Sequence, residues 1–110
     1  MNASQSVDLT DTPISSQPHG IVLVWSIYEN GSPQNWGFVE HFVPKEIVSL
    51  HGGGGHNFMM ATTDFGSVAC KYLYISDTTI SGNANNTASS TGSGISFTNS
   101  RYVLRYVIGV

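Results

Sequence analysis

The chain has 110 residues, which is enough for one hydrophobic core, since domains typically run to roughly 100–150 residues. We therefore expect a single domain over residues 1–110. Only 10% of the residues are charged, against roughly 25% in an average soluble protein, and the formal net charge is −3. The four cations, Lys45, Lys71, Arg101 and Arg105, are scattered and form no basic stripe, which argues against nucleic acid or an anionic membrane surface as a partner.

The sequence shows no targeting signal and, with a single cysteine, allows no intrachain disulfide bond. No apolar run approaches the ~20 residues that span a bilayer, and the opening MNASQSVDLTD lacks the basic and apolar regions of a signal peptide. We expect no membrane insertion and no Sec export. Cys70 is the sole cysteine, so synthesis in a reducing cytosol is the simplest interpretation. Its apolar surroundings favour a small core residue over a catalytic thiol.

Short strand signals recur along the chain, and no stretch keeps an apolar period of 3.6 residues. The predicted fold is therefore all-β, a small antiparallel β-sandwich or barrel with hardly any helix. Pro44 ends one strand, and KEIVSL after it could form one helical turn. The predicted strands cover residues 6–9, 21–28, 36–43, 57–61, 66–75 and 101–108.

The residue patterns of two predicted strands indicate how their faces are placed in the fold. In residues 21–28 both alternating sets are largely apolar, so the strand is central in a sheet or one face meets another subunit. Residues 101–108 alternate, with Tyr102, Leu104, Tyr106 and Ile108 on one face and Arg101, Val103, Arg105 and Val107 on the other. A chain that ends two residues after such a strand is expected to have its C-terminus docked in the sheet.

Three segments between the strands are read as turns or loops. Asn30-Gly31 is a strong hairpin signal ahead of the strand at residues 36–43. The HGGGGH stretch, His51 to His56, is expected to be a flexible loop because glycine permits most backbone paths. The polar stretch at residues 81–94 is expected to be a long exposed loop or turn that adds nothing to the core.

Catalytic and metal-binding patterns are scarce. No GxSxG, HExxH, paired cysteines or Walker-type lysine is present. His51 and His56 would need one or two further zinc ligands, such as His41 or Asp64, so we expect two exposed loop histidines that could hydrogen-bond a ligand, and no metal or cofactor.

A glycosidase would need two of the carboxylates facing each other at roughly 5–10 Å across a cleft. The candidates are Glu29, Glu40, Asp64 and Asp77. A single sandwich of this size seldom forms such a cleft alone, so we expect that the chain is not an enzyme.

Aromatic residues beside asparagine, aspartate and histidine point to saccharide binding, because sugar C–H faces stack on rings while hydroxyls take polar partners. Trp25, Tyr102 and Tyr106 are expected in the core, since they lie in alternating strands. Trp36 follows the turn sequence SPQN and is expected to stay half exposed. The candidate ligand-binding residues are Tyr28, Glu29, Asn35, Trp36, His51, His56, Asn57 and Asp77.

Four segments together carry a family resemblance: GIVLVWSIYENG (20–31), HFVPKEIVSLHGGGG (41–55), KYLYISDTTISGNANN (71–86) and SRYVLRYVIGV (100–110). They resemble the C-terminal head domains of receptor-binding and minor structural tail proteins of siphophages and prophages of Gram-positive hosts, notably streptococci and lactobacilli. The resemblance spans nearly the whole chain. It rests on strand and turn residues, with no catalytic motif among them.

This resemblance implies a homotrimeric, non-catalytic adhesion module at the phage tail tip that binds host cell-wall polysaccharide. It also implies synthesis in the host cytoplasm, a longer polypeptide upstream, and contacts with other tail or baseplate proteins. The alternative is a purely structural trimerisation domain of the tail or baseplate that binds no sugar.

Overall fold

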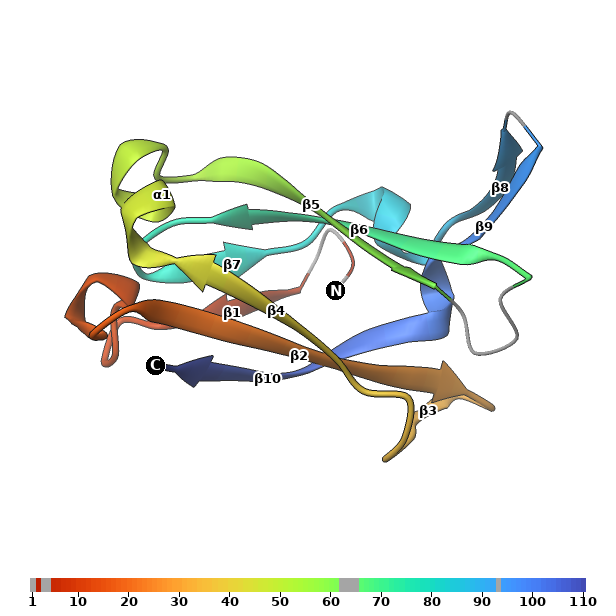
Figure 1. The fold of residues 1–110 in the computed structure, drawn as a ribbon, viewed down its shortest axis with the longest axis horizontal. Helices are drawn as coiled ribbons and strands as arrows, with labels where there is room; N and C mark the ends of the chain where they lie inside the picture. The colour runs from red at the N-terminus through yellow and green to blue at the C-terminus, as the bar shows by residue number, and fades with distance from the viewer. Residues whose placement is uncertain (1, 3–4, 62–65, 93) are drawn as a thin grey trace.

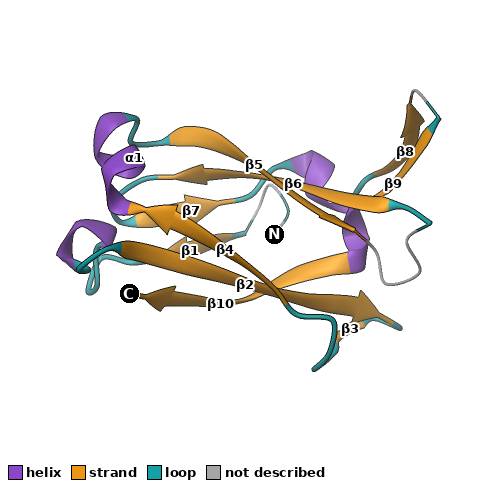
Figure 2. Ribbon diagram, in the orientation of Figure 1, coloured by secondary structure: helices purple, strands orange, loops and turns teal. Residues whose placement is uncertain are grey.

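The computed structural model describes residues 2, 5–61, 66–92 and 94–110. Short strands dominate these residues, and the helical segments between them are brief (Figure 2). The strands are β1 (Ser6–Asp8), β2 (Gly20–Glu29), β3 (Ser32–Pro33), β4 (Val39–Pro44), β5 (Gly54–Ala61), β6 (Val68–Ile75), β7 (Thr79–Ser81), β8 (Ser89–Gly92), β9 (Ile95–Thr98) and β10 (Tyr102–Gly109). The helical segments are the α-helix α1 (Lys45–Leu50) and the 3₁₀ turns η1 (Ile14–Ser16), η2 (Ala84–Thr87) and η3 (Asn99–Arg101). The predicted all-β class and the predicted helical turn are both confirmed.

The strands form two sheets that lie in layers (Figure 1). Within the described chain, one sheet has six strands in the order β1-β7-β6-β9-β8, with β5 also paired to β6. The other has four, with β10 and β4 on either side of β2 and β3 paired to the end of β2. One contact departs from the predicted antiparallel arrangement, because β9 pairs with β6 in parallel at Val68 and Phe97.

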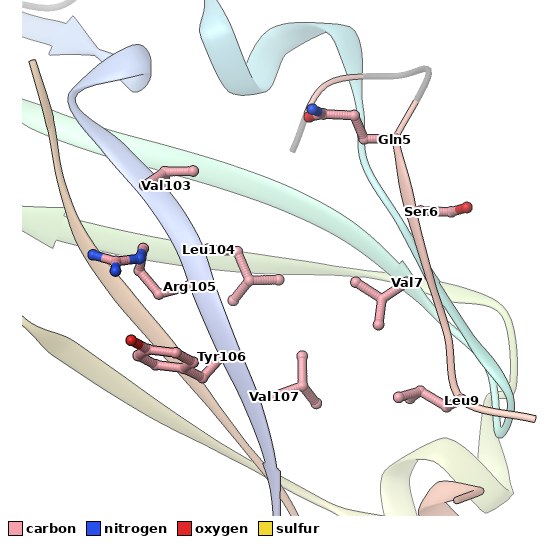
Figure 3. Close-up of a pocket in the computed structure, with 9 residues that line it drawn as sticks. All are labelled: Gln5, Ser6, Val7, Leu9, Val103, Leu104, Arg105, Tyr106 and Val107. Carbon is pink, nitrogen blue, oxygen red and sulfur yellow. The ribbon is translucent and has the colours of Figure 1, made fainter. Parts of the chain in front are cut away.

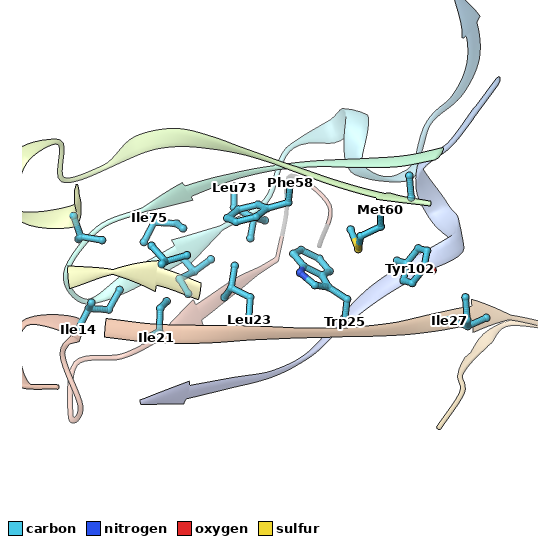
Figure 4. Packing of buried hydrophobic residues seen from close by; sticks show 14 residues of the cluster. Ile14, Ile21, Leu23, Trp25, Ile27, Phe58, Met60, Leu73, Ile75 and Tyr102 are labelled. Atoms are coloured by element: carbon cyan, nitrogen blue, oxygen red, sulfur yellow. The ribbon is translucent and has the colours of Figure 1, made fainter. Parts of the chain in front are cut away.

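The core fills the space between the two sheets (Figure 4). Alternate residues of β2 point inward, and Leu23, Trp25 and Ile27 are completely buried. They face Phe58 of β5 and Leu73 of β6, and the Trp25 and Phe58 ring centroids are 6.1 Å apart. Burial of each such side chain contributes about 1.5–3 kcal/mol, so this alternation is enough to select the register of β2. The central position predicted for residues 21–28 is confirmed.

Local signals in the sequence fix both ends of β2. Asn30 and Gly31 have φ values of 53° and 75°, as the tight hairpin turn between β2 and β3 requires, so the predicted turn is confirmed. At the other end, Val110 donates its N–H to the Gly20 carbonyl at 3.0 Å and accepts from the Gly20 N–H at 3.2 Å. The C-terminus is therefore docked in the sheet, as predicted.

The alternation predicted for the last strand is wrong beyond Leu104. A β-bulge at Arg105 shifts the register, so Leu104 lies opposite Trp25 while Tyr106 lies opposite Val24. As a result Tyr102 is buried but Tyr106 is 51% exposed on the outer face of the sheet, against the prediction that both belong to the core.

Three predicted boundaries or loops are also wrong. The glycine-rich stretch does not form a loop up to His56, because β5 begins at Gly54 and His56 and Asn57 lie within the strand. The strand predicted from Trp36 begins at Val39, so Trp36 precedes it. In the polar stretch 81–94, Asn86 is completely buried and donates to and accepts from the backbone of β6. Polar side chains enter a core when they satisfy backbone groups there.

Candidate functional site

The best-formed group of predicted site residues lies at the turn that follows β2. Gln34 returns to the strand by donating its N–H to the Ile27 carbonyl at 2.8 Å, and the Trp36 carbonyl accepts from the Ile27 N–H at 3.3 Å. Gly37 follows at a φ of 66°, a backbone conformation that favours glycine. This path leaves the Trp36 side chain 41% exposed, as predicted.

Arg101 connects this turn to the C-terminal part of the chain. Its Nη1 donates to Glu29 Oε2 at 3.0 Å, and its guanidinium carbon lies 5.9 Å from the centroid of the Trp36 ring. A guanidinium at this distance interacts favourably with the ring face and restricts its motion. The ion pair is partly exposed, so its contribution lies in positioning more than in stability.

Arg105 holds the neighbouring part of the same turn. Its Nη1 donates to the Ser26 hydroxyl at 3.0 Å and to the Gln34 carbonyl at 2.8 Å, and its Nη2 donates to Asn35 Oδ1 at 3.0 Å. The rigid fork of the guanidinium fixes these acceptors relative to one another. Neither arginine was among the predicted site residues, since regular alternation placed them with Val103 and Val107 and gave no sign of the turn that they contact.

Of the predicted residues, Glu29, Asn35 and Trp36 are brought together, with Tyr28 at the end of β2 beside them in the chain. His51 and Asp77 are not. His51 ends α1, which begins next to Gly20 at the other end of β2, about 30 Å away at ~3.3 Å per strand residue.

Asp77 has a structural role near that far end. Its Oδ1 accepts from the Ser15 N–H at 2.7 Å, its Oδ2 accepts from the Ser15 hydroxyl at 2.9 Å, and its carbonyl accepts from the Ile14 N–H at 2.9 Å. These bonds hold η1 against the turn between β6 and β7. The carboxylate of Asp77 is therefore engaged at η1. It does not face the carboxylate of Glu29, another candidate glycosidase residue, which pairs with Arg101.

The histidines are spread over several elements. His56 stacks nearly parallel to Phe58, with 6.4 Å between the ring centroids, and is partly buried, which corrects the expectation of an exposed loop residue. His41 also contacts Phe58, at 5.2 Å, and burial lowers its pKa from 6.5. No three His, Cys, Asp or Glu side chains cluster as a metal site within the described part of the chain. Asp64, a possible zinc ligand and catalytic carboxylate, lies outside the described residues.

A second polar and aromatic surface lies on the outer face of the six-stranded sheet. Its hollow, of about 340 Å³, is lined by Asn57, Cys70, Tyr72, Asn83 and Asn85, and by part of Lys71, a buried residue of β6 that alternates onto the inward face. Asn83 donates to the Tyr74 hydroxyl at 3.1 Å, and the rings of Tyr72 and Tyr74 meet edge to face at 5.3 Å. Asn57 belongs to this surface and not to the Trp36 turn. The other members come from β6 and the polar stretch, and only their position in the folded sheet brings them together.

The helical segments of the described chain are too short to cross a membrane, α1 having six residues. Comparisons with protein-family models, curated proteins and solved structures gave no match to the chain. The resemblance to phage tail proteins therefore stays a prediction.

Proposed function

We propose that the chain is a non-catalytic adhesion module that binds cell-wall saccharide, as the head of a phage tail receptor-binding protein does. The observation that carries the proposal is the Trp36 ring, which is 41% exposed and in contact with the Arg101 guanidinium. An exposed indole of restricted motion offers an apolar face for the C–H groups of a sugar with little loss of conformational entropy on binding.

Polar groups beside the ring supply the complementary hydrogen bonds. Glu29 engages Arg101 through Oε2 and Asn35 engages Arg105 through Oδ1, so both side chains are oriented before a ligand arrives. A carboxylate accepts and a carboxamide both donates and accepts, which suits the hydroxyl groups of a hexose. A site of this size is shallow and weak, and joining several copies in one particle would raise the effective affinity by about 10²–10⁴-fold.

The experiment is Trp36→Ala, assayed for binding to wall polysaccharide of Gram-positive bacteria. Loss of a stacking ring should cost on the order of 1–3 kcal/mol, roughly a 5- to 150-fold loss of affinity. Leu50→Ala is the matched control, because it removes another exposed apolar side chain at the far end of the molecule. Trp36→Phe should retain part of the binding.

Three outcomes decide between surfaces. Loss of binding in Trp36→Ala, with unchanged circular dichroism, supports the site at the turn. Unfolding of Trp36→Ala means that the ring serves the core. If that variant folds and binds as before, the turn is not the site, and Tyr74→Ala on the outer face of the six-stranded sheet is the next variant.

A second candidate function is structural trimerisation in a tail or baseplate, and the apolar outer face of the four-stranded sheet favours it. Val22 pairs with Phe42 on one side and Ile108 on the other, which gives a cross-strand apolar row, and Tyr106 lies in the next row. Phe42, Tyr106 and Ile108 are about half exposed, and such patches commonly mark association surfaces.

The outward row of β2 belongs to the second apolar face that the sequence predicts for residues 21–28, the face that would meet another subunit. Val107 does not extend this face, because it packs against the core. Light scattering of the chain tests assembly, with Ile108→Glu as the disrupting variant. A monomer at micromolar concentration contradicts a trimer formed by this domain alone. A trimer that binds no saccharide favours the structural function over adhesion.

A further inference from the structure

Lys71 is a charged residue in the interior of the sandwich. It lies on β6 between Ala69 and Leu73, all three of which alternate onto the inward face of the strand, and only 2% of its surface is exposed. Lysine is rarely buried to this extent unless an acidic group pairs with it. The ammonium group of Lys71 is therefore expected to have a negatively charged partner.

The described structure gives Lys71 one neutral partner and no counter-ion. Its Nζ donates to the Asn86 carbonyl at 2.7 Å, which engages one of three ammonium protons. The ion pair found among the described residues joins Arg101 to Glu29, so no described carboxylate lies within 4.0 Å of the ammonium. Burial lowers the pKa of Lys71 to about 8, and the side chain is still mainly cationic at neutral pH.

A hollow of about 190 Å³ adjoins this lysine. Its described lining is Asn2, Gln5, Tyr28, Lys71, Thr87, Ser100, Tyr102 and Val103. These described residues offer hydroxyl and amide groups that can donate hydrogen bonds and include no acidic side chain, so they favour a negative ligand. The volume equals roughly six waters at about 30 Å³ each, which suits one small anionic group and is too small for an oligosaccharide.

We propose that this hollow binds a small oxyanion, a carboxylate or phosphate group, with the Lys71 ammonium as its principal partner and the Thr87 and Ser100 hydroxyls as additional donors. The hollow includes Tyr28 but none of Glu29, Asn35 and Trp36, and the proposal does not depend on saccharide binding at the Trp36 turn.

The surroundings leave room for an anion that belongs to a larger molecule. Gln5 and Val103 also line a larger hollow, of about 680 Å³, that runs between β1 and β10. Figure 3 shows Val7 of β1 and Leu9, just after β1, on one side of it and Leu104 and Val107 of β10 on the other. A carboxylate or phosphate at Lys71 could therefore continue into a partly apolar groove.

The test is an NMR titration of the chain with sodium acetate and, separately, with inorganic phosphate, at constant ionic strength held by sodium chloride. Either anion should cause saturable shifts at Thr87 and Ser100 and raise the pKa of Lys71, because a bound negative charge favours the ammonium. In Lys71→Met the affinity should fall roughly tenfold or more, since a charge-assisted hydrogen bond is lost. Lys45→Met, which removes a lysine outside this hollow, should bind as the unaltered chain does.

Binding of acetate alone identifies a carboxylate site, and binding of phosphate alone identifies a phosphate site. Binding that persists in Lys71→Met overturns the proposal, as does the absence of saturable shifts with both anions. If Lys71→Met does not fold, the pKa of Lys71 in the unaltered chain decides, and a value that neither anion raises overturns the proposal.

Discussion

The buried lysine predicts an unusual dependence of stability on pH. Lys71 has a pKa of about 8 in the folded chain, against 10.5 for an ordinary lysine. The folded state thus binds fewer protons than the unfolded state between these values, and the free energy of unfolding should rise with pH across this interval. Each pKa unit corresponds to 1.36 kcal/mol, so the full interval contributes about 3 kcal/mol.

Urea unfolding followed by tryptophan fluorescence between pH 7.5 and 10, in buffers without carboxylate or phosphate, measures this rise. Lys71→Met has no titrating group at position 71 and should remove the rise, while Lys45→Met should keep it. The range ends at pH 10 because burial raises the pKa of Tyr102 above 10.0, and ionisation of that phenol in the unfolded state lowers stability at higher pH. A flat profile in the unaltered chain, equal to that of Lys71→Met, would falsify the reasoning and mean that water reaches the ammonium.

Three further outcomes are expected. Stability should fall as pH drops below 6.5, because burial lowers the folded pKa of His41 and the unfolded state then binds more protons; urea unfolding of His41→Gln should show a smaller fall. Gly20→Ala should lower the free energy of unfolding by about 2 kcal/mol or more in the same assay. Gly20 has a φ of +153°, and a Cβ there would lie 2.2 Å from the Val43 carbonyl oxygen. An unchanged free energy of unfolding would contradict this backbone placement. A chelator should leave the melting temperature unchanged, because among the described residues no cluster of three metal-ligand side chains includes His51 or His56; a drop of many degrees, with zinc in elemental analysis, would reverse that prediction.

The sequence was informative where one physical requirement dominates a segment. Both alternating sets of side chains in β2 are largely apolar, and Asn30-Gly31 readily adopts positive φ, so the central position of the strand and the turn after it were predictable from residue types alone. The half-exposed state of Trp36 was likewise predictable from the turn that precedes it. These features locate one end of the candidate site.

The polar stretch at residues 81–94 was misread because asparagine is compatible with both loops and buried networks. Asn86 accepts from the Tyr72 N–H at 2.7 Å and donates to the Tyr72 carbonyl at 2.9 Å, so its carboxamide occupies the position of a neighbouring strand. The Asn99 side chain bonds to the backbone in a similar way. Its Oδ1 accepts from the Cys70 N–H at 2.8 Å, and its Nδ2 donates to the Asn85 carbonyl at 2.8 Å. Composition indicates exposure for such residues, whereas backbone hydrogen bonds along β6 determine their burial.

The bulge in β10 explains why Arg105 was also missed. Regular alternation would place Arg105 on the same face as Val107, which packs against the core. The extra residue instead turns Arg105 and Tyr106 to the outer face, whereas Leu104 and Val107 point toward β1 (Figure 3). From that face the guanidinium reaches Ser26, Gln34 and Asn35 together. A one-residue irregularity of the last strand thus fixes the turn that presents Trp36. Deletion of Arg105 should let β10 pair regularly with β2, with Tyr106 and the later residues on their present faces, while the turn loses its guanidinium contacts and is released. Loss of Trp36-dependent binding, with the amide signals of residues 106–109 largely unchanged in NMR, would bear this out, whereas a deletion variant that still binds through Trp36 would show that the turn holds its shape without Arg105.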